Sequence, residues 1–78
     1  MNDRQLTSFL KIVETGSFSK AAQESYISVP AMVQQIDRLE EDLGFRLFSR
    51  TNQGVLLTED GVVFCEAVRK MKHIYEEA

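Results

Sequence analysis

The stretch from Ser28 to Gly44, SVPAMVQQIDRLEEDLG, constrains the fold more than any other part of the sequence. Ser28 is a typical helix N-cap, and Pro30 suits the first turn because its missing N–H is not needed there. Gly44 fits the position just after a helix. At helical spacing, one face carries Met32, Ile36, Leu39 and Leu43, and the opposite face carries Pro30, Gln34, Asp37 and Glu41. The stretch therefore predicts one helix with a buried apolar face and an exposed polar face.

Two shorter helices are predicted before this one. The first covers residues 3–15, with Asn2 or Asp3 as its cap and Gly16 as its end. A short second helix begins after the N-cap candidate Ser17. The inward positions are Leu6, Phe9, Leu10 and Val13 in the first helix, and Phe18, Ala21 and Ala22 in the second. The paired alanines favour a close approach between helices.

A β-hairpin and a long helix are predicted after Gly44. Alternation from Arg46 to Arg50 and the apolar run 55–57 predict two strands, joined by turn residues 52–54. Thr58 then caps a helix over residues 59–78, whose apolar stripe consists of Phe64, Ala67, Val68, Met71, Ile74, Tyr75 and Ala78. About 20 residues extend roughly 30 Å, which is more than the remaining elements can cover. The stripe predicts a dimer interface, or alternatively a face covered by a further domain.

Length and composition limit the class of protein. A chain of 78 residues forms one small domain at most. It contains no apolar run near the roughly 18 residues of a membrane span, and its N-terminus lacks a secretory-signal pattern. The single cysteine, Cys65, is expected to be a packed side chain in a reducing, cytoplasmic compartment. The net charge of −3 taken alone argues against nucleic acid, but charge placement matters more than the sum.

Enzyme chemistry is not indicated by the sequence. The chain has one His, one Cys, no Gly-rich phosphate loop and no Cys/His cluster with metal-ligand spacing. Ser17 and Ser28 are interpreted as helix caps, and nothing suggests a base that would activate either hydroxyl. His73 lies on the polar face of the last helix and is expected to be solvated. We therefore expect no catalytic residue, no cofactor and no metal.

The order of elements describes a mainly α winged helix-turn-helix: a three-helix core, a β-hairpin wing and a long C-terminal helix. The short second helix, followed by a tight connection at Tyr26-Ile27, braces the third helix. The N-terminal end of that third helix can then enter the major groove, which is about 12 Å wide and admits one helix. The wing is expected against the DNA backbone or the minor groove.

The motifs together resemble the N-terminal domain of LysR-type transcriptional regulators over nearly the whole chain. The matching residues are the Leu6, Phe9, Val13 pattern; Gly16-Ser17-Phe18-Ser19-Lys20-Ala21-Ala22; Ser28-x-Pro30-Ala31; Gln35-Ile36; Leu39-Glu40-Glu41-x-Leu43-Gly44; Leu47-Phe48-x-Arg50; and Leu57-Thr58-x-x-Gly61. This resemblance implies a dimerising DNA-binding domain. It also implies that a larger C-terminal domain, which binds a small-molecule effector, follows in the natural protein, so that this chain is a fragment of a longer regulator.

Several positions depart from the family pattern. Val29 stands where Gln usually reads bases, and Val33-Gln34 replaces the usual Ser-Arg pair. Asp37 stands where the family often has a basic residue, and Gln53 replaces the Arg or Lys of the wing. These differences concern sequence preference and affinity, and they leave the expected fold unchanged.

The residues expected to face DNA are Ser28, Val29, Pro30, Ala31, Val33, Gln34, Arg38, Arg50, Thr51 and Gln53. The valines and Ala31 can pack on thymine methyl groups, and Gln34 can bridge to adenine. The alternative is that Val29 and Val33 only support the packing of helix against hairpin. Arg38, Arg46 and Lys20 are candidates for sequence-independent backbone contacts.

Two charged residues leave alternatives open. The resemblance places Arg50 at a phosphate, and the rival interpretation is a structural ion pair with Glu40 or Asp42. Asp37 either accepts from a cytosine amino group or is solvated, and solvation is favoured because a carboxylate near phosphates is unfavourable.

The sequence thus predicts a DNA-binding unit over residues 1–58 and a dimerisation helix over residues 59–78. The dimer interface is assigned to Phe64, Ala67, Val68, Met71, Ile74 and Tyr75. The expected partners are double-stranded DNA and a second copy of the chain, with no metal or membrane, and the effector is expected only in the C-terminal domain. The alternative function is a winged-helix protein–protein adaptor that has lost DNA binding.

Overall fold

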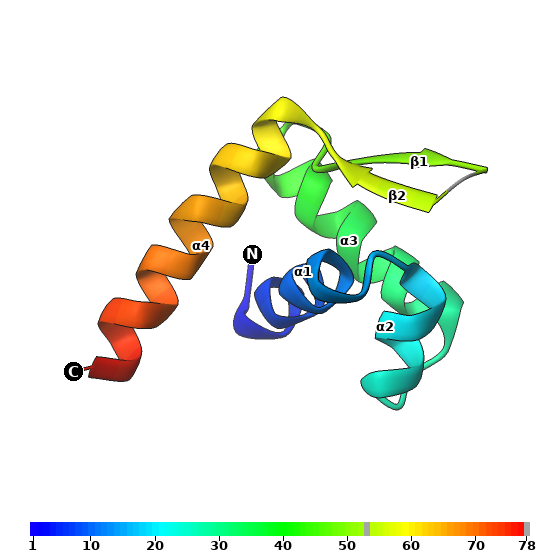
Figure 1. The fold of residues 1–78 in the computed structure, drawn as a ribbon, viewed down its shortest axis with the longest axis horizontal. Helices are drawn as coiled ribbons and strands as arrows, with labels where there is room; N and C mark the ends of the chain where they lie inside the picture. Colours follow the sequence, from blue (N-terminus) through cyan, green and yellow to red (C-terminus); the bar gives the residue numbers. More distant parts are fainter. Residues whose placement is uncertain (53, 78) are drawn as a thin grey trace.

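The computed structural model describes residues 1–52 and 54–77. Three helices form a core, a two-stranded antiparallel hairpin extends from one end of it, and the last helix leads away along its side (Figure 1). The elements are α1 (Asp3–Thr15), α2 (Phe18–Glu24), α3 (Val29–Leu43), β1 (Phe48–Thr51), β2 (Gly54–Leu57) and α4 (Glu59–Glu77). The predicted mainly α winged helix-turn-helix is confirmed.

The start of α1 is held by a reciprocal capping pair. The Asn2 side chain accepts from the Gln5 backbone N–H at 2.9 Å, and the Gln5 side chain accepts from the Asn2 N–H at 3.2 Å. Two otherwise unpaired donors at the helix start are thereby satisfied. At the other end, Gly16 takes a left-handed φ of 70° and its N–H donates to Ile12. Both predicted boundaries of this helix are confirmed.

The turn between α2 and α3 is tight. Ser17 caps α2 by accepting from the Lys20 N–H at 3.1 Å, and the Ile27 N–H donates back to Ala22 at 3.1 Å. Between α2 and α3, Tyr26 adopts a left-handed φ of 58°. This conformation lets the chain reverse within a few residues, so that α2 supports α3 in the helix-turn-helix arrangement.

The hydrophobic core confirms the predicted inner face of α3. Met32, Ile36 and Leu39 are fully buried, and Leu43 is partly buried at the edge of the same cluster. Phe9 of α1 lies at the centre of the cluster, with its ring centroid 5.3 Å from that of Phe48 and 5.2 Å from that of Phe64. One core therefore joins α1, α3, the first strand and the beginning of α4.

The hairpin is shorter than predicted on its first side. β1 begins at Phe48, which pairs with Leu57, whereas the sequence pattern placed the strand from Arg46. The difference arises because the Leu47 N–H donates to Glu40 of α3, and the Leu47 carbonyl accepts from the Thr58 N–H. Leu47 is thus bonded to α3 and to the segment before α4, and it takes no part in the ladder.

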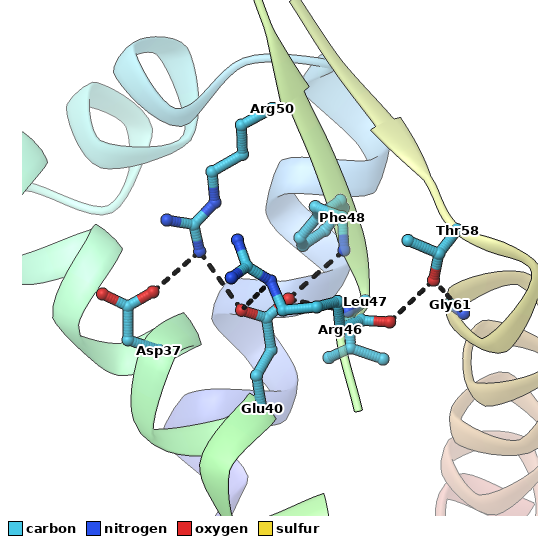
Figure 2. Close-up of polar contacts among 8 residues, drawn as sticks. All are labelled: Asp37, Glu40, Arg46, Leu47, Phe48, Arg50, Thr58 and Gly61. Atoms are coloured by element: carbon cyan, nitrogen blue, oxygen red, sulfur yellow. Dashed lines mark hydrogen bonds and ion pairs between the residues drawn. The ribbon is translucent and has the colours of Figure 1, made fainter. Parts of the chain in front are cut away.

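The start of α4 is fastened to the residues before the hairpin (Figure 2). The Thr58 hydroxyl accepts from the Gly61 N–H at 2.9 Å and donates to the Arg46 carbonyl at 2.7 Å. A Cβ atom at Gly61 would lie 2.1 Å from the Leu47 carbonyl oxygen. The Leu57-Thr58-x-x-Gly61 motif therefore has a structural cause, because only glycine permits this close approach.

The apolar stripe of α4 is divided between core and solvent. Val68, with Cys65 beside it on the helix, is buried within the single chain, and Phe64 is partly buried against Phe9. Val68 is therefore a core residue, which corrects its assignment to the dimer interface. Farther along, Met71, Ile74 and Tyr75 are exposed, with Tyr75 at 84%. Ala78 lies outside the described residues.

Candidate nucleic-acid interface

The N-terminal end of α3 is open to solvent. Ser28 is exposed and caps the helix by accepting from the Ala31 N–H at 3.2 Å. Val29 and Pro30 follow it and are also exposed. Because the first backbone N–H groups of a helix carry partial positive charge, this end can bind an anion without a side-chain cation. The predicted Ser28, Val29, Pro30 and Ala31 therefore lie together at one helix end.

Farther along α3, the residues predicted to face DNA differ in exposure. Gln34 and Arg38 are exposed and lie one turn apart on the outer side of the helix. Ala31 and Val33 are only partly buried. Val33 is thus partly exposed, on the flank between the inner and the outer face of α3.

The wing arginine is engaged inside the chain. Arg50 Nη2 lies 2.9 Å from Asp37 Oδ1 and 3.4 Å from Glu40 Oε1 (Figure 2). The central carbon of its guanidinium lies 4.9 Å from the centre of the Phe18 ring. The structure therefore contains the ion pair between Arg50 and Glu40 that was the rival interpretation. Asp42, the other proposed partner, instead pairs with the N-terminal ammonium group at 2.8 Å.

Asp37 differs from the expected solvated carboxylate, because Arg50 contacts it directly. Arg50 belongs to β1, and only the folded hairpin brings its guanidinium to this position on α3. Asp37 nonetheless remains 51% exposed on the outer side of α3. It therefore combines an internal ion pair with an exposed position.

Glu40 organises the junction between α3 and the wing, and sequence reasoning assigned it only a motif position and one possible ion pair. Its side chain is 6% exposed. Its Oε2 accepts from the Leu47 N–H at 2.6 Å and the Phe48 N–H at 3.3 Å. Its Oε1 lies 3.4 Å from Arg46 Nε. A buried carboxylate with these donors fixes where the wing leaves the core. In the sequence, the signal for a buried Glu40 was its place next to Leu39 on the inner face of the helix.

The remaining predicted contacts lie around this surface. Thr51 is exposed at the end of β1, and its hydroxyl donates to the Gly54 carbonyl at 3.2 Å. Lys20 on α2 and Arg38 on α3 are exposed, and neither forms an ion pair within residues 1–52 and 54–77. Gln53, predicted to contact DNA from the wing, lies outside the described residues.

Tyr26 is a surface residue that the sequence interpretation treated only as part of a turn. Its side chain is 95% exposed, and it lies two residues before the cap of α3. A bulky residue with positive φ is uncommon, and such positions are found often at functional sites. The one sequence signal for an exposed residue here was the presence of an aromatic side chain in a predicted tight turn.

Among the described residues, no group of three or more His, Cys, Asp and Glu side chains could hold a metal ion. No helix in this part of the chain has the length and apolar character required to cross a membrane.

Comparison with known proteins identifies the family. The sequence pattern of the bacterial regulatory helix-turn-helix proteins of the lysR family matches residues 4–62. The chain belongs to the LysR family. It comprises the DNA-binding helix-turn-helix domain of that family, which is one of transcriptional regulators and not of enzymes. The resemblance inferred from the motifs is confirmed.

The family assignment agrees with full-length relatives and with solved structures. The HTH-type transcriptional regulator ClcR of Pseudomonas putida is 43% identical over 76 residues, which are 97% of this chain and 26% of ClcR. The chain thus spans about a quarter of the length of that relative. The crystal structure of a CbnR_DBD–DNA complex matches with a TM-score of 0.91 and 34% identity, over 99% of this chain and 88% of that one.

A second structural match is a full-length regulator. LysG from Corynebacterium glutamicum, solved with bound effector Arg, matches with a TM-score of 0.86 and 38% identity. The match covers 99% of this chain and 26% of LysG. The winged helix-turn-helix described here therefore has the same fold as domains found both alone and within longer regulators.

Proposed function

We propose that this domain binds specific DNA sequences as a dimer and thereby regulates transcription, with α3 in the major groove of each half-site. The observation that carries the proposal is the open N-terminal end of α3, where Ser28, Val29 and Pro30 are exposed together. This is the part of a recognition helix that reaches base edges in helix-turn-helix proteins. The match to a domain solved in complex with DNA supports the same assignment.

The proposed base contacts follow from the exposed chemistry of α3. Met32, Ile36 and Leu39 on its inner face are fully buried and prevent rotation of the helix, so the outer residues keep a constant direction. Gln34 can make a bidentate contact to adenine, and Val29, Ala31 and Val33 offer methyl groups to thymine. Ser28 and the helix N–H groups position the helix at a phosphate.

The proposed backbone contacts come from residues flanking α3. Lys20, Arg38 and Arg46 are exposed cations, and Thr51 is an exposed hydroxyl on the wing. Such contacts fix orientation without reading sequence. The wing, comprising residues 46–57, is proposed to lie on the backbone or in the minor groove, with Gln53 among its contacts. A symmetric pair of domains would double each of these contacts.

Dimerisation is proposed through residues 59–78, with residues 1–58 as the DNA-binding unit. Met71, Ile74 and Tyr75 expose a continuous apolar strip on α4. A groove between α4 and α1 borders it, lined in part by Leu6, Val68 and Met71. Large exposed apolar patches mark association surfaces, and a second α4 has the length and chemistry to cover this one. Phe64, which is partly buried against Phe9, and the exposed Ala67 are proposed to belong to the same interface.

The proposal extends to the whole regulator. Because the chain spans about a quarter of ClcR, the remainder of a regulator of that length would hold the effector-binding domain. LysG solved with bound effector Arg supports a small-molecule effector. We place the regulator in the cytoplasm, where the bacterial chromosome is.

A duplex titration tests DNA binding against the alternative of a protein–protein adaptor. Asp37 and the net charge of −3 favour the adaptor, whereas the open α3 terminus favours DNA. We expect fluorescence anisotropy with duplex DNA to show binding that weakens as salt rises, because phosphate contacts release counterions. Binding that is absent at low salt, for genomic and random duplexes alike, would favour the adaptor.

A paired substitution tests the dimer. Met71→Asp combined with Tyr75→Asp is expected to give a monomer by light scattering, because buried carboxylates without partners are costly. The control is Val62→Asp, which changes an exposed apolar residue on the polar side of α4 and should leave the dimer intact. An unchanged mass for the double variant would rule out this interface.

A further inference from the structure

A compact charge cluster joins the outer side of α3 to the wing. It contains Asp37, Glu40, Arg46 and Arg50, two negative and two positive groups (Figure 2). The cluster therefore has no net charge, although it lies where the proposed function places the negatively charged DNA backbone. Two of the chain's nine cationic side chains are partly neutralised there.

The guanidinium of Arg50 has three neighbours, and both carboxylates contact the same nitrogen, Nη2. Asp37 Oδ1 lies at 2.9 Å, Glu40 Oε1 lies at 3.4 Å, and the Phe18 ring lies below at 4.9 Å, leaving the side chain 28% exposed. A carboxylate and a phosphate present similar pairs of oxygens to a guanidinium. Asp37 thus offers Arg50 the same kind of oxygen acceptor that a DNA phosphate would offer.

The carboxylates of Glu40 and Asp37 differ in burial and in hydrogen bonding. Glu40 is buried and accepts from two backbone N–H groups, so the fold requires it. Asp37 is half exposed, and its contact within the described residues is with Arg50. The structure therefore does not need Asp37 for any backbone hydrogen bond, which leaves the restraint of Arg50 as its physical effect.

We propose that Asp37 is an internal competitor for DNA phosphate, which keeps Arg50 from contributing to binding of arbitrary DNA. This inference rests on the proposed function. A phosphate must either displace Asp37 from Arg50 or approach a carboxylate, and both cost free energy regardless of base sequence. Non-specific binding consists almost wholly of phosphate contacts, so it loses most. A specific complex retains the base contacts of α3.

Two single substitutions, each of which removes one negative charge from α3, separate the release of Arg50 from a general electrostatic effect. Asp37→Asn releases Arg50, whereas Glu41→Gln removes the charge of an exposed residue one turn away that forms no ion pair in the described part of the chain. The probe is a random-sequence duplex titrated by anisotropy between 50 and 200 mM salt. We expect Asp37→Asn to bind about ten-fold more tightly than Glu41→Gln at the lowest salt.

The salt dependence gives a second readout. One added phosphate contact steepens the slope of log K against log salt by about 0.9, so the advantage of Asp37→Asn should shrink about three- to four-fold across the range. In an Arg50→Gln background, verified as folded by circular dichroism, the two substitutions should have equal effects. If that background does not fold, the comparison of the two single variants decides.

The outcomes distinguish this inference from the proposed function. Equal affinities and equal slopes for the two variants, with the unchanged protein still binding duplex, would overturn the competitor role alone. If the unchanged protein and both variants bind neither random nor genomic duplexes at 50 mM salt, the proposed function is overturned and this inference with it. Binding by Asp37→Asn alone would support the competitor role in its strongest form.

Discussion

Replacing Glu40 by alanine is expected to remove the hydrogen bonds that hold the wing to α3 and to lower the free energy of unfolding of the domain by a large fraction. The carboxylate accepts from the N–H groups of Leu47 and Phe48 and pairs with two arginines while only 6% exposed. Alanine would leave both backbone donors without their acceptor at the point where the hairpin begins. The same change would remove one of the two carboxylates that hold Arg50.

The magnitude follows from the contacts. Hydrogen bonds to a charged acceptor contribute about 1.5–3 kcal/mol each, and removing one partner of a buried charged group costs about 3–5 kcal/mol. The pair with Arg46 adds little because that side chain is largely exposed, and alanine returns a few tenths of a kcal/mol in helix propensity. We expect Glu40→Ala to lower the free energy of unfolding by about 3–5 kcal/mol. A domain of 78 residues has about 4–12 kcal/mol in total.

Urea unfolding followed by circular dichroism measures this difference. Glu40→Gln keeps one acceptor oxygen and should lose less than the alanine variant, which keeps the comparison quantitative if Glu40→Ala is unfolded in buffer. Glu41→Ala is the matched control, because Glu41 is exposed and surface changes usually stay within about 0.5 kcal/mol. If Glu40→Ala lost less than about 1 kcal/mol, the assignment of Glu40 as the anchor of the wing would be wrong.

Two further predictions concern backbone geometry. Gly61→Ala should destabilise by about 1–3 kcal/mol in the same urea assay, although Gly→Ala within a helix usually stabilises, because the new Cβ meets the Leu47 carbonyl oxygen at 2.1 Å; a stabilised variant would contradict this. Tyr26→Asn should raise the melting temperature by several degrees, because asparagine adopts a φ of 58° at less cost than tyrosine. A lower melting temperature would show that the exposed tyrosine ring makes stabilising contacts.

Local signals made most of the fold predictable. The caps Asn2, Ser17 and Ser28 and the terminal glycines Gly16 and Gly44 act within a few residues of chain, so sequence alone locates the helix ends. The apolar spacing of α3 likewise depends only on helical geometry. The residues at the open end of α3 could therefore be named before the structure was known, because they follow directly from where the helix begins.

Contacts between distant segments were less predictable. The expected strand began at Arg46 because alternation was the available signal, whereas the ladder begins at Phe48 after Leu47 has bonded to Glu40 and Thr58. Val68 shared an apolar stripe with residues of the proposed interface, and spacing could not show that the core reaches it. The end of the core along α4 depends on how α1 packs against that helix.

The sequence by itself determined the order of elements, the helix ends, the inner face of α3 and membership in the LysR family. Those features arise from short-range capping and periodicity, which each segment carries independently. The tertiary structure alone decided that Arg50 pairs with Asp37 as well as Glu40, and that α4 is buried through Val68 and exposed beyond it. The physical reason is that ion pairs and burial depend on which segments meet in space, and residues far apart along the chain meet only when the core has closed.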